Sequence, residues 1–139
     1  MAYKFLSPEW LQALKDKLNS DAQYARIARN WEGDIMFHVE PANPDQPPTR
    51  LYLDLWHGRC RDAFTVADNQ TDELKPAFVL RAPYAVFRRI LASELDPMQA
   101  MITRKLKVQG SMAYMLRNVP VVLDFVRCAQ EVDTDFEVE

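Results

Sequence analysis

The segment LYLDLWHGRCRDAFTV, residues 51–66, constrains the fold more than any other part of the sequence. Three leucines alternate with other residues in its first half, as expected for a strand with one buried face. The dipeptide His57–Gly58 marks a turn, and the returning run carries Phe64 and Val66. Because strands joined by so short a turn must be antiparallel, this segment predicts a β-hairpin.

Three further segments predict strands of the same sheet. The run DIMFHVE (34–40) alternates apolar and other residues, and the runs AFVLR (77–81) and KLKVQ (105–109) are also typical of strands. Between the first of these runs and the hairpin, residues 41–49 contain four prolines in nine residues, so we expect an exposed loop there. Together with the hairpin, these segments predict a mostly antiparallel sheet of about five strands.

Helices are expected before the sheet and between its last strands. Ser7, Pro8 and Glu9 have the pattern of an N-cap, a first helical proline and a favourable first-turn charge. The run SDAQ, which begins at Ser20, has the capping-box pattern and predicts a second, short helix. Further helices are predicted over residues 82–96, 98–103, 112–118 and 121–132. The fold class is therefore α+β, a five-stranded, mostly antiparallel sheet covered on one side by helices.

Length and charge limit the classes of function. The chain has 139 residues and a formal net charge of −3, so we expect a single domain over 1–139 and no nucleic-acid partner. The N-terminal segment lacks the apolar region of a signal peptide, and no apolar run is long enough to span a bilayer. Cys60 and Cys128 fit no metal or redox spacing. These features predict a reduced, cytoplasmic protein with at most transient membrane contact.

Charged residues gather in three places. Basic residues cluster at Arg88–Arg89 and at Arg104–Lys107, and the last seven residues, Asp133–Glu139, are mostly acidic. We interpret all three as solvated faces. A basic patch at a membrane surface is the alternative.

The residues that usually carry catalysis are scarce. His38 and His57 are the two histidines, and neither has a further ligand-type residue at metal spacing. Cys60 lies three residues after His57, which does not establish an activated pair. With three glycines in the chain, a phosphate-binding loop is excluded. We therefore expect no catalytic residue, no metal and no cofactor.

Apolar residues are in excess in the last third of the chain. In the run VPVVLDFV (119–126), they cover nearly the whole circumference of a helix, which indicates burial on both sides. In so small a chain, a ligand or a second subunit of a homodimer would cover one side. Methionine pairs also flank the strand KLKVQ, at Met98 and Met101 and at Met112 and Met115. Methionine adapts to irregular apolar surfaces, so these pairs either fill a core or line a binding site.

The stretch DPMQAMITRKLKVQGSMAYMLRN, residues 96–118, resembles the signature of the sterol-carrier-protein-2 family. In that family a short helix leads into a strand reading Lys-Leu-Lys-(Val/Ile)-x-Gly, followed by a small polar residue, a methionine and an apolar helix. The earlier segments GDIMF, YLDL and CRDAFTVAD are similar to the family's first three strands. The similarity covers about residues 7–130.

The resemblance implies an apolar tunnel between sheet and helices that holds fatty acyl chains, acyl-CoA, sterols or other lipids. It places eleven apolar side chains of the later helices in this tunnel. They are Phe87, Ile90, Leu91, Met98, Met101, Ile102, Met112, Met115, Leu116, Val122 and Phe125.

One residue departs from the family pattern. The family often has glycine just before KLK, where this sequence has Arg104. Glycine suits a positive φ, so we expect the turn here to differ. Arg104 is interpreted as an exposed loop residue, and contact with an anionic head group is the alternative.

The function implied by the resemblance is non-enzymatic binding of an apolar or amphiphilic lipid, with transfer. Two alternatives remain at this point. The first is an interaction or dimerisation module that buries the apolar C-terminal helix against a partner. The second is an accessory domain that presents a lipid to a partner enzyme, because members of the family also occur as appended domains.

Overall fold

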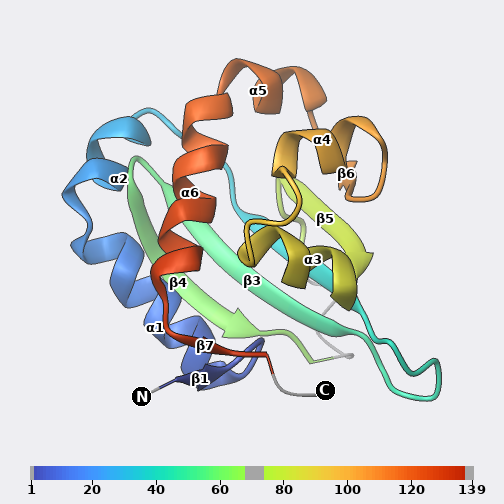
Figure 1. Ribbon diagram of the computed structural model, residues 1–139. Helices are drawn as coiled ribbons and strands as arrows, with labels where there is room; N and C mark the ends of the chain where they lie inside the picture. The colour runs from blue at the N-terminus through green and yellow to red at the C-terminus, as the bar shows by residue number, and fades with distance from the viewer. Residues whose placement is uncertain (1, 68–73, 137–139) are drawn as a thin grey trace.

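The computed structural model describes residues 2–67 and 74–136. A five-stranded sheet has the order β4-β3-β2-β5-β6, and helices cover one side of it (Figure 1). The strands are β2 (Ile35–Glu40), β3 (Thr49–Trp56), β4 (Arg59–Thr65), β5 (Phe78–Pro83) and β6 (Lys107–Gln109). The predicted α+β class is therefore confirmed.

The sheet is mixed. Three of its four strand pairs are antiparallel, as predicted, whereas β2 and β5 are parallel. The chain passes from the β3–β4 hairpin to the other side of β2, so β2 lies at the centre of the sheet. One face of β2 points towards the helices and the other points away from them.

The hairpin turn has the predicted position. His57 and Gly58 have φ angles of 50° and 81°, which matches the two-residue turns that fit the twist of a hairpin. A Cβ on Gly58 would lie 2.6 Å from the carbonyl oxygen of Ala25, so only glycine fits at this position.

Six helices are described, and most begin where the capping pattern places them. They are α1 (Pro8–Ser20), α2 (Ala22–Ile27), α3 (Tyr84–Leu91), α4 (Pro97–Ile102), α5 (Met112–Arg117) and α6 (Val119–Glu131). The side chains of Ser7, Asp96 and Ser111 accept backbone N–H groups at the starts of α1, α4 and α5. The cap of α2 is Asp21 and not the predicted Ser20, because Ser20 is still part of α1.

Helix α3 is shorter than the sequence predicts. It ends at Leu91, whereas the periodicity continues to Leu95. Ser93 has φ 63°, and the N–H of Glu94 donates to the carbonyl oxygen of Arg89 at 2.8 Å. This closing pattern ends a helix at a left-handed residue, which is usually glycine.

The two ends of the chain meet in a second sheet that the sequence did not predict. β1 (Tyr3–Lys4) pairs in parallel with β7 (Thr134–Asp135). Beside this pair the rings of Phe5 and Phe136 lie 5.1 Å apart. The acidic segment is therefore not solvated throughout, because Thr134, Asp135 and Phe136 are half-buried, and its residues 137–139 lie outside the described part.

Candidate ligand-binding cavity

An apolar cavity of about 100 Å³ lies between the sheet and the helices. Its floor consists of the helix-facing residues of β2, β3 and β5, namely Ile35, Phe37, Val39, Leu51, Leu53, Leu55 and Leu80. All 25 residues that line it are aliphatic, aromatic, methionine or proline. Because alternate residues of a strand point to the same side, the apolar residues of these strands form one continuous wall of the cavity.

Seven of the eleven side chains expected in the tunnel line this cavity. They are Phe87, Ile90 and Leu91 of α3, Met101 of α4, Met115 of α5, and Val122 and Phe125 of α6. Met98 and Met112 are half-buried and pack against the core, but they do not line the cavity.

The other two expected side chains point outwards. Ile102 is 62% exposed and Leu116 is 51% exposed, and neither lines the cavity. Each directly follows a cavity-lining methionine. Consecutive residues of a helix point about 100° apart, so one residue of each pair reaches the cavity while the next faces the solvent.

The cavity walls formed by the strands and by the first two helices were not predicted from the sequence. Trp10, Leu14 and Tyr24 line it from α1 and α2, and Trp31 lines it from the following segment. The signal was present in the alternation of β2 and β3 and in the leucine spacing of α1. The same signals are also typical of ordinary core residues, so they could not distinguish residues that line a cavity from residues that fill the protein core.

The indole N–H groups at the cavity are already satisfied by the protein. Trp10 Nε1 donates to Thr134 Oγ1 at 2.8 Å, and Trp31 Nε1 donates to the Gly33 carbonyl oxygen at 2.8 Å. Burial raises the pKa of Tyr24, so its phenol stays protonated at neutral pH. The cavity thus presents apolar surface and no ionised lining residue.

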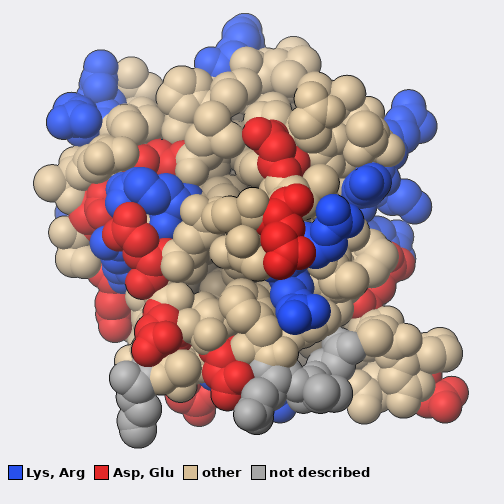
Figure 2. All heavy atoms as spheres, viewed as in Figure 1, with Lys and Arg blue, Asp and Glu red and all other residues tan. Residues whose placement is uncertain are grey.

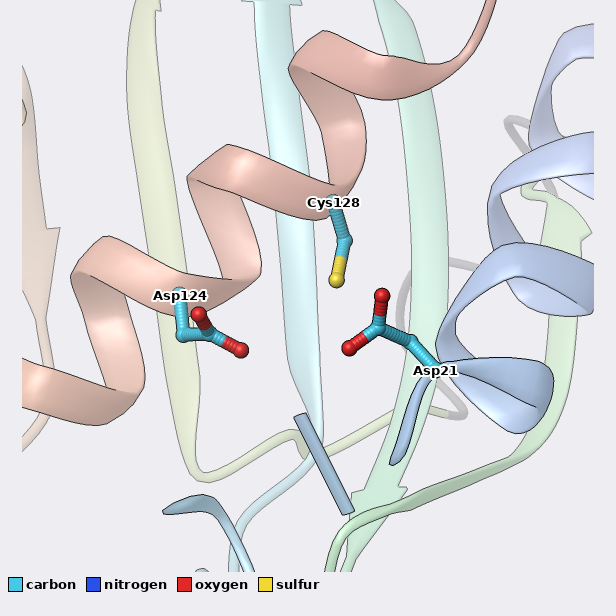
Figure 3. A group of neighbouring side chains, drawn as sticks. All are labelled: Asp21, Asp124 and Cys128. Atoms are coloured by element: carbon cyan, nitrogen blue, oxygen red, sulfur yellow. The ribbon is translucent and has the colours of Figure 1, made fainter. Parts of the chain in front are cut away.

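A cluster of Asp21, Asp124 and Cys128 lies outside the cavity, between α6 and the start of α2 (Figure 3). The guanidinium of Arg127 forms ion pairs with both carboxylates of this cluster. Its Nη2 lies 2.7 Å from Asp21 Oδ1, and its Nε lies 2.8 Å from Asp124 Oδ1. Hydrogen bonds from Arg127 are the main reason that the pKa of Asp21 is lowered. A guanidinium therefore supplies the positive charge, and we interpret the cluster as a structural ion network.

Both cysteines are buried free thiols. Burial raises the pKa of Cys60 to about 12 and that of Cys128 to about 11. Because the thiolate is the reactive form, neither thiol is set up as a nucleophile at neutral pH. His57, which is near Cys60 in sequence, instead contacts Glu32, with Nε2 and Oε2 2.7 Å apart at the surface.

The cavity is too small for a long-chain lipid as it stands. An apolar cavity of about 150 Å³ accommodates benzene, which is much smaller than a fatty acid. The lining residues nevertheless extend along several helices and strands, from Phe5 at one end of the chain to Ala129 near the other. A long-chain lipid would fit this site only if the cavity became larger.

Comparisons with known proteins place this cavity in a family context. The model of the SCP-2 sterol transfer family matches residues 11–122. Comparison with curated protein sequences gives no significant match. In the part of the chain that the structure describes, no helix has the length and apolar character needed to cross a membrane.

Solved structures have the same fold. A crystal structure of sterol carrier protein 2 is 30% identical, with a TM-score of 0.82, and the match covers 93% of this chain and 99% of that one. The solution structure of a conserved hypothetical protein from Thermus thermophilus, a possible sterol carrier protein, is 28% identical, with a TM-score of 0.82 and 97% and 94% coverage. Aedes aegypti sterol carrier protein-2 in complex with the C16 fatty acid palmitate is 16% identical, with a TM-score of 0.55 and 91% and 98% coverage.

Proposed function

Because the chain belongs to the SCP-2 sterol transfer family, we propose that it binds an apolar or amphiphilic lipid between its sheet and helices and transfers it. A fatty acid, an acyl-CoA or a sterol-like molecule fits this class. The observation that carries the proposal is the cavity itself, whose 25 lining residues are all apolar or aromatic. A palmitate complex of the mosquito protein supports it at the level of the fold.

The driving force is the burial of the lipid's apolar surface. Each buried methylene contributes about 0.8 kcal/mol, so sixteen methylenes give roughly 13 kcal/mol before the costs of ordering the chain and opening the cavity. Even if these costs took half of that energy, a dissociation constant of about 20 μM would remain. No chemical step is needed for this function, so we propose a binding protein and not an enzyme.

We propose that the seven later-helix residues that line the cavity contact the lipid directly. Val122 and Leu123 offer a matched pair of positions on α6, because Val122 lines the cavity and Leu123 is 43% exposed. The substitution Val122→Trp fills the space with an indole, whereas Leu123→Trp places the same ring in solvent.

The test is displacement of a fluorescent fatty acid from the purified protein. We expect Val122→Trp to weaken probe binding by about tenfold or more, and Leu123→Trp to leave it unchanged. Lipid extracted from the denatured wild-type protein should be detected by mass spectrometry. If no lipid is extracted, the probe does not bind and sedimentation shows a tight dimer, the proposal is wrong. The protein would then be interpreted as a dimerisation module.

A further inference from the structure

The segment that carries helices α4 and α5 has an unusual charge for this protein. From Pro97 to Leu123 the sequence has no acidic residue and four basic ones, in a chain whose net charge is −3. The basic residues are Arg104, Lys105, Lys107 and Arg117, and all four are exposed. This segment therefore presents positive and no negative side chains to the solvent.

The same two helices expose large apolar side chains. Ile102 and Leu116 are among the few large hydrophobic residues that are open to solvent, and each directly follows a methionine that lines the cavity. Helices α4 and α5 both pack against α6 and lie at the same end of the molecule (Figure 1). Each helix thus has an inner face on the cavity and an outer apolar residue beside basic ones.

We propose that Ile102, Arg104, Lys105, Leu116 and Arg117, here named the α4–α5 surface, dock onto an anionic lipid bilayer. Ile102 and Leu116 enter the interface between head groups and acyl chains, and the basic side chains contact the phosphates. Docking in this orientation brings the cavity-lining residues Met101 and Met115 up to the bilayer. The proposal concerns the outer faces of the helices, so it goes beyond lipid binding in the cavity.

Charge complementarity selects this occupant. The upper edge of the molecule in Figure 2, over α5, carries basic and uncharged side chains, whereas the acidic side chains visible on this face lie lower. Basic residues near an anionic membrane each contribute a favourable electrostatic interaction, and partly inserted apolar side chains add to it. A second copy of the chain is disfavoured at this surface, because a two-fold interface would place the same basic residues opposite one another.

Vesicle flotation tests the proposal with the full chain. We expect the protein to bind vesicles of equimolar phosphatidylcholine and phosphatidylglycerol, to bind phosphatidylcholine vesicles much less, and to be released from the anionic vesicles by high salt. The double substitution Lys105→Gln/Arg117→Gln should weaken binding by about 30-fold, because each charge near the surface is worth about fivefold. The double substitution Ile102→Ser/Leu116→Ser should weaken it by at least about tenfold.

A matched control changes the net charge equally at a distance from this surface. Lys4 of β1 is exposed and Lys15 of α1 is half-buried, and both elements lie away from α4 and α5 in Figure 1. The double substitution Lys4→Gln/Lys15→Gln should therefore leave vesicle binding within about twofold of wild type. All variants should bind the fluorescent fatty acid in solution as the wild type does, which separates docking from the cavity function. The proposal is overturned if the wild type does not bind anionic vesicles, or if the control variant loses as much binding as the surface variants.

Discussion

The two sides of the helical layer are held in different ways. On one side α1, α2 and α6, here named the anchored side, are joined by charged contacts: Lys17 Nζ lies 2.7 Å from Glu131 Oε1, and Arg127 Nη2 lies 2.7 Å from Asp21 Oδ1. On the other side α3, α4 and α5, here named the cover, have eight, six and six residues. The side-chain contacts that tie α3 and the residues after it to α6 are between uncharged groups, because Gln130 Nε2 donates to the Ile90 carbonyl oxygen at 3.0 Å and to Ser93 Oγ at 3.1 Å. Two residues beside the cover helices, Ser93 and Arg104, have φ 63°.

This difference suggests which side moves when the cavity opens. Short helices gain little stability on their own and depend on packing for their position. The cover helices contribute five of the seven expected residues that line the cavity, so their displacement would enlarge it. We therefore expect the anchored side to remain in place while the cover adjusts to the lipid.

The largest expected effect comes from truncating a leucine on each side. Leu18 of α1 is fully buried, and Leu18→Ala should lower the free energy of unfolding by about 4 kcal/mol. Leu91 of α3 is half-buried and borders the existing cavity, so Leu91→Ala should cost only about 1 kcal/mol. Urea unfolding at neutral pH measures both values, and equal losses would show that the cover is held as firmly as the anchored side.

The next effect concerns the ion network of the anchored side. Asp124 is buried, and Arg127→Gln removes the guanidinium that contacts both it and Asp21. We expect the free energy of unfolding at pH 7 to fall by about 3 kcal/mol, because the buried carboxylate of Asp124 and the half-buried one of Asp21 lose their partner. Arg89→Gln, an exposed change on the cover with the same loss of charge, should cost less than about 0.5 kcal/mol.

The network also sets a pH dependence. Arg127 lowers the pKa of Asp21 in the folded protein, so this carboxylate stabilises the fold fully above its unfolded pKa of about 4. The stabilisation is lost as the pH falls from that value through the lower folded pKa. The stability of the wild type should therefore fall below pH 4 more steeply than that of Arg127→Gln. Parallel curves in urea unfolding at a series of pH values would contradict this origin of acid sensitivity.

Local signals in the sequence predicted most elements of the fold. Caps such as Ser7 and Asp96, and the His57–Gly58 turn, fix the backbone within a few residues, and the structure has them where they were expected. The pairing of β1 with β7 joins the two ends of the chain through strands of two residues each, so no local pattern could reveal it. The parallel β2–β5 pair was missed for a related reason. The alternation of apolar residues shows which face of a strand is buried, but it does not show which strand pairs with it.

The candidate site was predicted in part. Longer helices define an inner face, and on α3 the expected residues Phe87, Ile90 and Leu91 all line the cavity. A helix of six residues has fewer than two turns, so apolar neighbours such as Met101 and Ile102 do not reveal which of them faces inwards. The strand residues were predicted as buried, but burial against helices and burial against a cavity have the same pattern in sequence.

The smallest expected effect tests the turn after α4, where this sequence departs from its family. Arg104 has φ 63°, a left-handed conformation that glycine adopts without strain and arginine does not. A left-handed conformation costs a residue with a side chain roughly 1–2 kcal/mol, and glycine's greater freedom in the unfolded chain returns about 0.4–1 kcal/mol of this. Arg104→Gly should therefore raise the free energy of unfolding by about 0.5–1 kcal/mol.

The neighbouring substitution Lys105→Gly is the matched control, because Lys105 is not among the positive-φ residues and glycine there should destabilise the fold slightly. Urea unfolding should thus give changes of opposite sign at adjacent positions, and a loss of stability in both would refute the strain at Arg104. Both substitutions remove one positive charge from the α4–α5 surface, so both should weaken binding to anionic vesicles by about fivefold. If Arg104→Gly gains stability while losing vesicle binding, the arginine is retained in a strained conformation for its contact with the membrane and not for the fold.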